Sequence, residues 1–292
     1  MGTVKSARGK RKAKVELAVL SALIVVALVA VCGVSYRLHG GGQDETEVKI
    51  AVIGSSDDQI WKAVQAEMDR RGDKIHVTLK PFQDAIYVNQ ALNNREVDLN
   101  AAQHYAFLEN DSKTNGYHLA VLGDTYISPM NLYSKRYKRV SDIPEGAKVA
   151  IPNNATNMGR ALKVLERAGL ITLRDPNTTT PVPEDVRDNP KHLTIEQTDP
   201  AGIINLLPDY GGGVVNANFV VDAGMKVTDA IFQVPYDLKD PANHPYVNII
   251  VANADRKDDP VLRKVVAAYH TKAVADTINS IYKGAAVPAF TA

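Results

Sequence analysis

The residues best suited to bind a small charged molecule are residues 152–160, PNNATNMGR. They follow the expected strand at residues 148–151, KVAI, and begin a helix that we predict over residues 157–168, ended by Gly169. Unpaired N–H groups and the positive end of the helix dipole favour an anion at such a position, and a guanidinium binds a carboxylate through two hydrogen bonds. Arg160 therefore predicts a carboxylate site, although an arginine on a helix face is more often an ordinary solvated residue.

Two asparagines beside apolar runs are the next polar candidates. Asn216 stands in VVNANF and Asn248 in PYVNIIV. An amide offers a donor and an acceptor to an amino acid's carboxylate and ammonium, and a buried polar group without partners costs about 1–3 kcal/mol. Spacing alone favours the plainer interpretation, in which both side chains bond to local backbone. His104 is likewise more often a packed or surface histidine than a ligand contact.

The sequence carries no motif of a common enzyme class. It lacks a G-x-S-x-G elbow, a P-loop, H-E-x-x-H, an EF-hand loop and a dinucleotide-binding glycine pattern. The seven histidines are dispersed and Cys32 is the single cysteine, so we expect no zinc site, no intrachain disulfide and no cofactor.

Alternating apolar strands and amphipathic helices predict an α/β fold with parallel-type sheets. Residues 48–54, VKIAVIG, are expected to form a buried strand, and Ser56 or Asp57 to cap the helix that follows. Further short segments of the alternating series lie near 75–79, 97–100, 119–121, 148–151, 193–195, 214–215, 231–234 and 247–251, with helical segments near 87–92, 157–168, 259–269 and 271–282. If the chain crosses between two lobes at residues 126–133 and again at residues 247–251, the second lobe is inserted into the first.

Three longer segments, ALNNREVDLNAAQH, AIPNNATNMGRAL and PYVNIIV, resemble signature segments of the NlpA/MetQ family of methionine-binding lipoproteins. The similarity runs in order from about Val48 to Pro288. It implies a two-lobed, periplasmic-binding-protein-like fold of type II, with a ligand cleft between lobe 1 (residues 44–130 and 246–292) and lobe 2 (residues 131–245). It also implies the substrate-binding component of an ABC importer, with a permease and an ATPase as partners, rather than an enzyme.

The same resemblance assigns roles to five residues. Arg160 is expected to hold the ligand carboxylate. Asn157, Asn216, Asn248 and His104 are expected to complete the polar end of the cleft.

Two alanines depart from the family pattern. Ala85 and Ala102 stand where the family places the aromatic walls that enclose the methionine side chain, so sulfur–aromatic contacts of roughly 0.3–1.5 kcal/mol each are removed. Tyr87 and Tyr105 lie nearby in sequence and are candidates to replace those walls. We therefore predict a retained amino-acid clamp with an altered side-chain pocket, which takes methionine, a bulkier amino acid or a short peptide.

Residues 1–43 predict a membrane tether. Six basic side chains precede residue 17, and residues 17–36 carry no charge and are long enough to cross the roughly 30 Å hydrocarbon core. The basic flank predicts a cytoplasmic N-terminus and an extracytoplasmic body held at the cell membrane. Cys32 ends the sequence VAVC, which resembles the lipobox of bacterial lipoproteins, so lipidation and an uncleaved signal anchor both stay open.

The remainder of the chain is mildly acidic. Residues 1–32 hold six of the 34 basic and one of the 33 acidic side chains, which leaves a net charge of −4 for the rest. Nucleic acid is not an expected partner, because its phosphates need a clustered basic face. Two alternative functions stay open: an enzyme that uses the same cleft, with His104 beside Glu109 or Asp98, and a tethered receptor without a transporter.

Overall fold

The computed structural model describes residues 45–175, 178, 180–235 and 238–292, and Thr46–Ala292 form one compact unit. The predicted membrane segment (residues 17–36) and Cys32 lie outside the described residues. Within the described part of the chain, no helix combines the length and the apolar character needed to cross a membrane.

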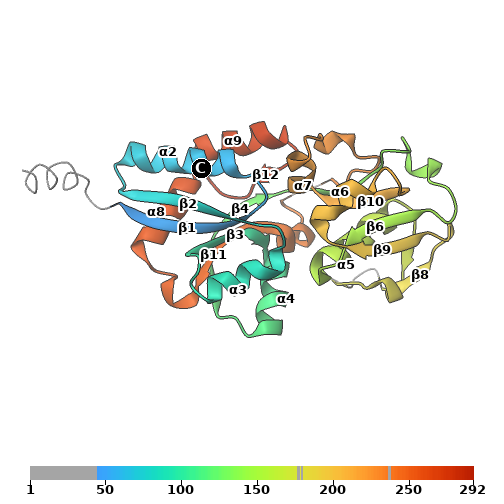
Figure 1. Ribbon diagram of the computed structural model, residues 1–292, viewed down its shortest axis with the longest axis horizontal. Helices are drawn as coiled ribbons and strands as arrows, with labels where there is room; N and C mark the ends of the chain where they lie inside the picture. The colour runs from blue at the N-terminus through green and yellow to red at the C-terminus, as the bar shows by residue number, and fades with distance from the viewer. Residues whose placement is uncertain (1–44, 176–177, 179, 236–237) are drawn as a thin grey trace, which may run out of the picture. The chain divides into compact units, whose positions relative to one another are not determined.

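The compact unit contains two larger sheets and one short hairpin, together with helices (Figure 1). Its strands are β1 (Thr46–Ile53), β2 (Ile75–Phe82), β3 (Leu99–His104), β4 (Leu119–Ile127), β5 (Met130–Tyr133), β6 (Lys148–Pro152), β7 (Thr172–Leu173), β8 (Val186–Asp188), β9 (Thr194–Thr198), β10 (Gly212–Asn216), β11 (Val247–Asn253) and β12 (Val287–Pro288). Its α-helices are α2 (Asp58–Arg71), α3 (Val88–Asn93), α4 (Tyr105–Asn115), α5 (Ala155–Arg167), α6 (Ile203–Leu206), α7 (Ala217–Asp222), α8 (Pro260–Tyr269) and α9 (Lys272–Tyr282).

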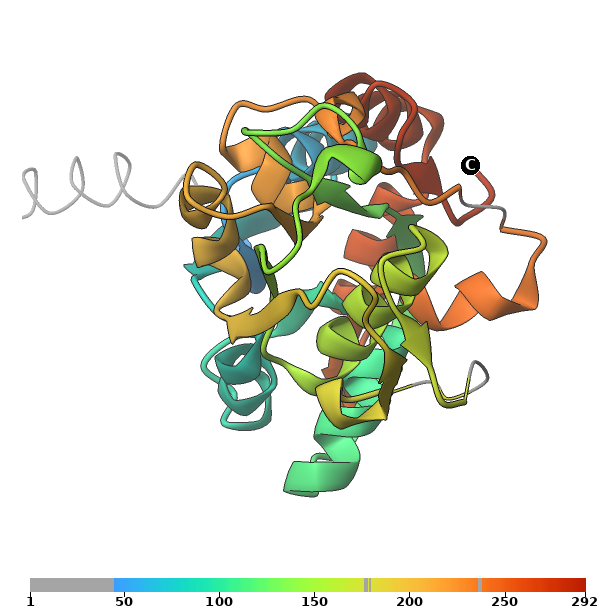
Figure 2. The ribbon, with the colours of Figure 1, turned by 90° about the vertical axis from the view of Figure 1, so that its right-hand side faces the viewer.

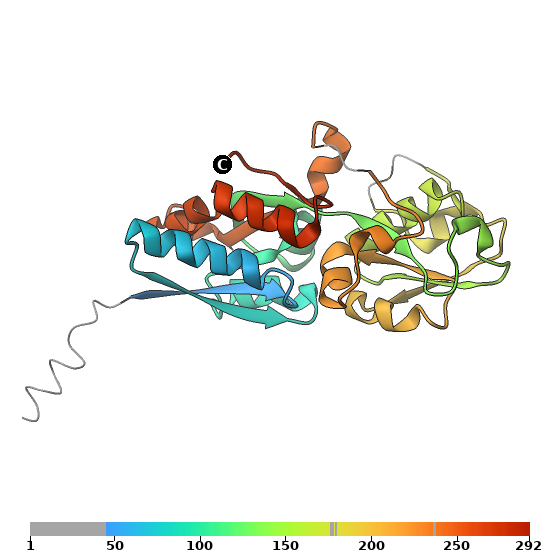
Figure 3. The ribbon, with the colours of Figure 1, turned by 90° about the horizontal axis from the view of Figure 1, so that it is seen from above.

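The larger sheet has six strands in the order β12-β4-β11-β3-β1-β2. β1 pairs in parallel with β2 and β3, whereas β11 runs antiparallel to both β3 and β4. The sheet is therefore mixed, and the prediction of a parallel-type sheet was incomplete. Helices α2 and α9 lie side by side over one face of this sheet although they are far apart in sequence (Figure 3).

The smaller sheet has four strands in the order β5-β10-β6-β9, with β5 antiparallel to β10 and the other pairs parallel. It occupies the end of the unit that faces the viewer in Figure 2. Helix α5 packs against this sheet through a buried apolar face that includes Met158, Leu162 and Leu165. The chain passes from the larger sheet to the smaller one in only two residues, Ser128 and Pro129, between β4 and β5.

Each sheet has apolar clusters of its own. Ile50, Trp61 and Tyr269 belong to the main cluster of the six-stranded sheet, and Met130, Ile151 and Leu162 to that of the four-stranded sheet. Burying such side chains contributes about 1.5–3 kcal/mol each, so each sheet has a core of its own. The cavity walls described below are held by these cores rather than by loops alone.

Local signals explain where the helices start and stop. Helix α5 begins after Asn154, whose side chain accepts a hydrogen bond from the Asn157 N–H, and the chain leaves it at Gly169, which has a φ of +72°. At the start of α2, Asp57 is the N-cap residue by position, but its side chain makes no capping bond. The prediction of a capping role for that side chain was wrong, because the carboxylate is engaged elsewhere.

Candidate ligand-binding site

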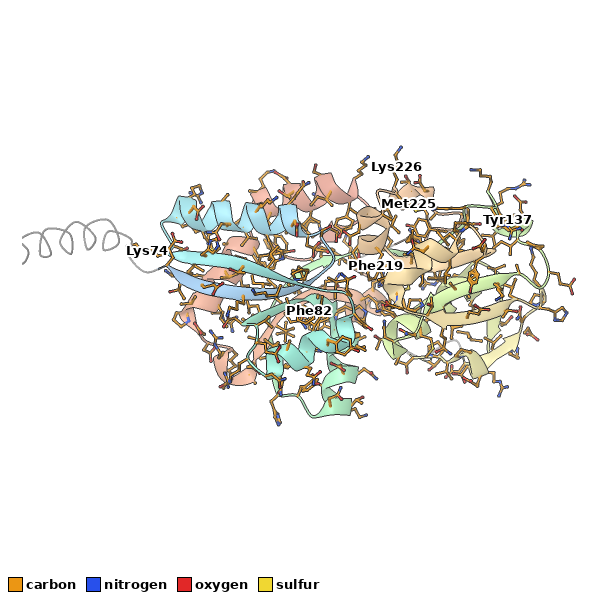
Figure 4. All side chains as sticks on the ribbon, viewed as in Figure 1. Lys74, Phe82, Tyr137, Phe219, Met225 and Lys226 are labelled. Atoms are coloured by element: carbon orange, nitrogen blue, oxygen red, sulfur yellow. The ribbon has the colours of Figure 1, made fainter. Side chains whose placement is uncertain are left out.

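A cavity lies where elements of the two sheets approach each other. Its empty volume is about 800 Å³, which includes space open to solvent. Phe219 of α7, labelled in Figure 4, is one of its wall residues. All seven residues assigned to the cleft from sequence line it: Ala85, Ala102, His104, Asn157, Arg160, Asn216 and Asn248.

Arg160 forms a positive part of the cavity wall. Its side chain is buried, with 6% of its surface exposed, and Nη2 donates to the carbonyl of Ser128 at 2.8 Å. The ring of Tyr246 covers the guanidinium at 4.7 Å. Asn154 and Asn157 line the same cavity at the N-terminus of α5. The N-terminus of this helix adds the positive end of the helix dipole. Arg160 is therefore a fixed cavity residue rather than a solvated surface residue.

His104 and two asparagines form a chain of hydrogen bonds along the cavity. His104 Nδ1 accepts from the Phe107 N–H as the N-cap of α4, so the neutral ring carries its proton on Nε2. Nε2 then donates to Asn157 Oδ1 at 3.3 Å, and the same oxygen accepts from Asn216 Nδ2 at 3.3 Å. The Oδ1 atom of Asn216 is buried and has no hydrogen-bond partner within the described residues. An N–H donor of a ligand would satisfy this acceptor.

Asn248 fixes the other side of the polar wall. It lies opposite His104 in the β3–β11 pair, and its Nδ2 donates to the carbonyl of Tyr126 on β4 at 3.0 Å. The plainer interpretation, a bond to local backbone, is wrong for this residue, because the carbonyl that it bonds belongs to a strand 122 residues away.

A buried polar network supports this wall from behind. The Asn89 amide donates to Gln103 and to Asp111, and its oxygen accepts from Asn100 and Gln103, at distances of 2.7–2.8 Å. Asn89, Asn100 and Gln103 are all buried. Gln103 also lines the cavity, next to His104 in sequence. The network explains how β3, with the sequence LNAAQH, can be buried although three of its six residues are polar: its two amides bond to Asn89, which fixes the strand.

His104 stays neutral at physiological pH. Burial, together with the positive charge of Arg160, lowers the pKa of His104 to about 3. The histidine is therefore a hydrogen-bonding group in the cavity and is not a proton donor poised near pH 7.

This low pKa predicts acid sensitivity. Because the pKa of His104 is about 3 in the folded protein and 6.5 for an unperturbed histidine, the unfolded state binds the extra proton as the pH falls below 6.5. The folded state should lose about 2–3 kcal/mol from this source between pH 7 and pH 4. We expect His104→Asn, which retains a capping side chain, to remove that loss in urea unfolding measured across this range. Equal pH slopes for the two proteins would contradict the assignment.

Asp57 is a cavity residue that the sequence pattern concealed. It lines the cavity, and its Oδ1 accepts from the hydroxyl groups of Tyr126 at 2.8 Å and Tyr282 at 3.4 Å. Burial, with smaller contributions from the nearby acids Asp222 and Asp58, raises the pKa of Asp57 to about 6. Its sequence position, directly before a helix, is the ordinary position of a capping residue, so no local signal distinguishes it.

The two alanines lie in the cavity wall, but the tyrosines named as their replacements do not. Tyr87 is 57% exposed, while the Tyr105 hydroxyl donates to Asp124 and its ring stacks on His244 at 4.8 Å. Neither belongs to the cavity lining. Its aromatic members are Phe107, Tyr126 and Phe219, together with the His104 ring.

The acid–base pairs considered from sequence are not assembled here. Asp98 accepts from Arg256 and from the Lys49 N–H, and Glu109 is exposed on α4. Neither carboxylate lines the cavity beside His104. Within the described residues, no group of three or more His, Cys, Asp or Glu side chains could hold a metal ion.

Comparison with known proteins decides the family. The model of the NlpA lipoprotein family matches residues 48–290. This chain belongs to the NlpA lipoprotein family. The match spans both sheets and every cavity residue named above.

Individual family members are similar over nearly the whole compact unit. Lipoprotein 28 of Escherichia coli O157:H7 is 37% identical over 84% of this chain and 89% of its own length. The D-methionine-binding lipoprotein MetQ of Escherichia coli K12 is 34% identical over 87% of this chain and 93% of its own. A nutrient-binding protein from Burkholderia cenocepacia, solved bound to methionine, superposes with a TM-score of 0.76 at 34% identity, over 83% of this chain and all of that one.

Proposed function

We propose that this chain is the extracytoplasmic substrate-binding component of an ABC importer and that its cavity holds an amino acid or a short peptide. The observation that carries the proposal is that one cavity holds both a positive group and an unsatisfied hydrogen-bond acceptor. Arg160 and the N-terminus of α5 supply the positive charge, and the buried Asn216 oxygen has no donor within the described residues. The carboxylate of an amino acid would bind the first, and its ammonium would donate to the second. Two of the relatives described above are named for methionine or were solved with it.

The fold suggests how such a ligand would be enclosed. We take residues 44–130 and 246–292 as one lobe and residues 131–245 as the other; the strand membership of the two sheets supports this division, except that β5 of the four-stranded sheet begins at Met130. His104 comes from the first lobe, while Asn157 and Arg160 come from the second. The ligand would therefore stabilise the closed arrangement by contacting both lobes, which makes closure a signal to the permease and the ATPase.

The proposal places the body outside the cytoplasm, tethered to the cell membrane by the N-terminal segment. Membership in a lipoprotein family supports lipidation at Cys32. Mass spectrometry of the N-terminal peptide would identify an acylated Cys32 or an intact leader. Uptake of labelled amino acids in a strain that lacks the protein distinguishes a transport component from a receptor without a transporter.

Calorimetry on the full chain in mild detergent tests the proposed ligand class. We expect one or more amino acids or short peptides to bind, and we expect amides of the same compounds, which lack the carboxylate, to bind at least 100-fold more weakly. Equal binding of acids and amides would contradict the carboxylate site.

The alanine walls predict a gain of methionine affinity on substitution. In Ala102→Phe, or the matching change at Ala85, a ring would enter the cavity wall and offer sulfur–aromatic contact. Each contact contributes about 0.3–1.5 kcal/mol, so methionine affinity should rise roughly 2- to 12-fold. Ala273→Phe, on the exposed face of α9, is the control and should leave affinity unchanged. A fall in methionine affinity would show that the native pocket already encloses that side chain.

A further inference from the structure

Asp57 has no partner of opposite charge within the described residues. Its recorded hydrogen bonds come from Tyr126 and Tyr282, and its electrostatic neighbours Asp222 and Asp58 are acids. A carboxylate has about four acceptor positions, and the two tyrosine hydroxyl groups approach mainly one of its oxygens. A partly buried carboxylate in such surroundings is unfavourable to the folded state unless something else compensates its charge.

The orientation of Asp57 also sets it apart from its neighbours. Its side chain does not cap α2, although it stands at the N-cap position. The other carboxylate of the cavity, Asp84, accepts instead from the N–H of Ile86 at 3.1 Å and thereby caps its own short helical turn. Asp58, the next residue, does not line the cavity. Asp57 is thus the carboxylate whose position serves the cavity rather than the local backbone.

The position of Asp57 relative to Arg160 is set by two residues of one chain segment. Arg160 donates to the carbonyl of Ser128, and the Tyr126 side chain reaches from two residues earlier to Asp57. Asp57 precedes α2, which packs on the six-stranded sheet, whereas Arg160 lies on α5, which packs on the four-stranded sheet. Asn216, whose Oδ1 has no partner within the described residues, bonds to Asn157 of the same helix as Arg160 and is the acceptor on the Arg160 side of the cavity, so Asp57 is a second, separate acceptor on the opposite side.

We propose that Asp57 binds a primary ammonium group of the ligand that lies several bonds away from the carboxylate held at Arg160. This inference rests on the proposed function and deepens it. The ligand class is a zwitterion with separated charges. Two sources share that chemistry: the N-terminal ammonium of a dipeptide and the side-chain ammonium of a basic amino acid. The Asn216 oxygen remains the acceptor for an N–H group next to the carboxylate.

Matched probe pairs test the proposal by calorimetry on the full chain in mild detergent at pH 7.5. One pair is lysine and norleucine, and the other is alanyl-methionine and its N-acetyl derivative, so that the members of each pair differ in the distant ammonium. We expect the ammonium member of at least one pair to bind at least tenfold more tightly, and the pair that shows this identifies the source. Asp57→Asn should abolish the difference. Asp58→Asn, which removes the adjacent charge outside the cavity, should preserve it.

A second measurement separates a ligand-binding role from a structural one. Asparagine still accepts the tyrosine hydroxyl bonds, while the uncompensated charge is removed. The ligand-free Asp57→Asn protein should therefore melt about 2–6 °C higher than the unchanged protein at pH 7.5. A carboxylate that only holds the tyrosines in place would give a lower melting temperature instead.

The outcomes that overturn the inference are distinct from those that overturn the proposed function. No ammonium preference in either pair, a preference that survives Asp57→Asn, or one that is abolished by Asp84→Asn instead would each refute the role of Asp57 and leave the binding function intact. Failure of the unchanged protein to bind all four probes, and every amino acid tested above, would refute both.

Discussion

Replacing Arg160 by alanine is expected to weaken ligand binding at least 30-fold. The guanidinium is buried in the cavity wall, and truncating one member of a buried charge pair typically costs 2–5 kcal/mol, or about 30- to 5,000-fold in affinity. Arg160→Lys should restore only part of the loss, since an ammonium cannot reproduce two parallel hydrogen bonds to a carboxylate. Calorimetry with the best ligand from the amino-acid and peptide panel measures the effect.

Arg167→Ala is the matched control, because Arg167 lies on the same helix but is exposed and does not line the main cavity. It should leave affinity within about twofold of the unchanged protein. Circular dichroism should show that Arg160→Ala is folded, because the buried apolar face of α5 is unaltered. A folded Arg160→Ala protein with unchanged affinity would remove the carboxylate role from this residue.

Asn89→Ala is expected to destabilise the protein by about 2–4 kcal/mol. The side chain makes four hydrogen bonds, to Asn100, Gln103 and Asp111, and is fully buried. Its removal leaves several buried polar groups without partners, which is more costly than the loss of an isolated bond. Urea unfolding at pH 7.5 measures the change in the free energy of unfolding.

Asn93→Ala provides the control for this network, since Asn93 is exposed at the end of the same helix α3. Its effect should stay within about 0.5 kcal/mol. The network also predicts reduced ligand affinity in Asn89→Ala, because Gln103 lines the cavity directly before His104. Stability equal to that of the unchanged protein would show that the network tolerates loss of its central amide.

Much of the cavity could be reached from sequence because its residues sit at element boundaries. Arg160 follows a strand end and an Asn-capped helix start, and Asn216 ends β10 at the start of α7. Spacing alone nevertheless favoured a plainer role for Arg160, Asn216, Asn248 and His104. The resemblance to a family then assigned these residues, together with Asn157, to the cleft. Local chemistry and family pattern together were sufficient here because both describe short segments.

Asp57 could not be reached in this way. Its cavity role depends on Tyr126 and Tyr282, which are 69 and 225 residues away in sequence. The antiparallel direction of β11 and the orientation of Tyr105 away from the cavity are also determined by long-range contacts. Neither the strand direction nor the bond of Tyr105 to Asp124 can be recognised from the neighbouring sequence. Long-range partners therefore decide which of several plausible polar residues face the cavity.

Native mass spectrometry of the full chain, released from detergent after purification from cells grown in rich medium, tests the central claim most directly. The account predicts a retained small molecule whose mass is that of an amino acid or short peptide. It also predicts loss of that mass from Arg160→Ala prepared in parallel, and its retention by Arg167→Ala. A retained compound without a carboxylate, or equal retention of the same compound by Arg160→Ala, would contradict an amino-acid-binding cavity built around Arg160.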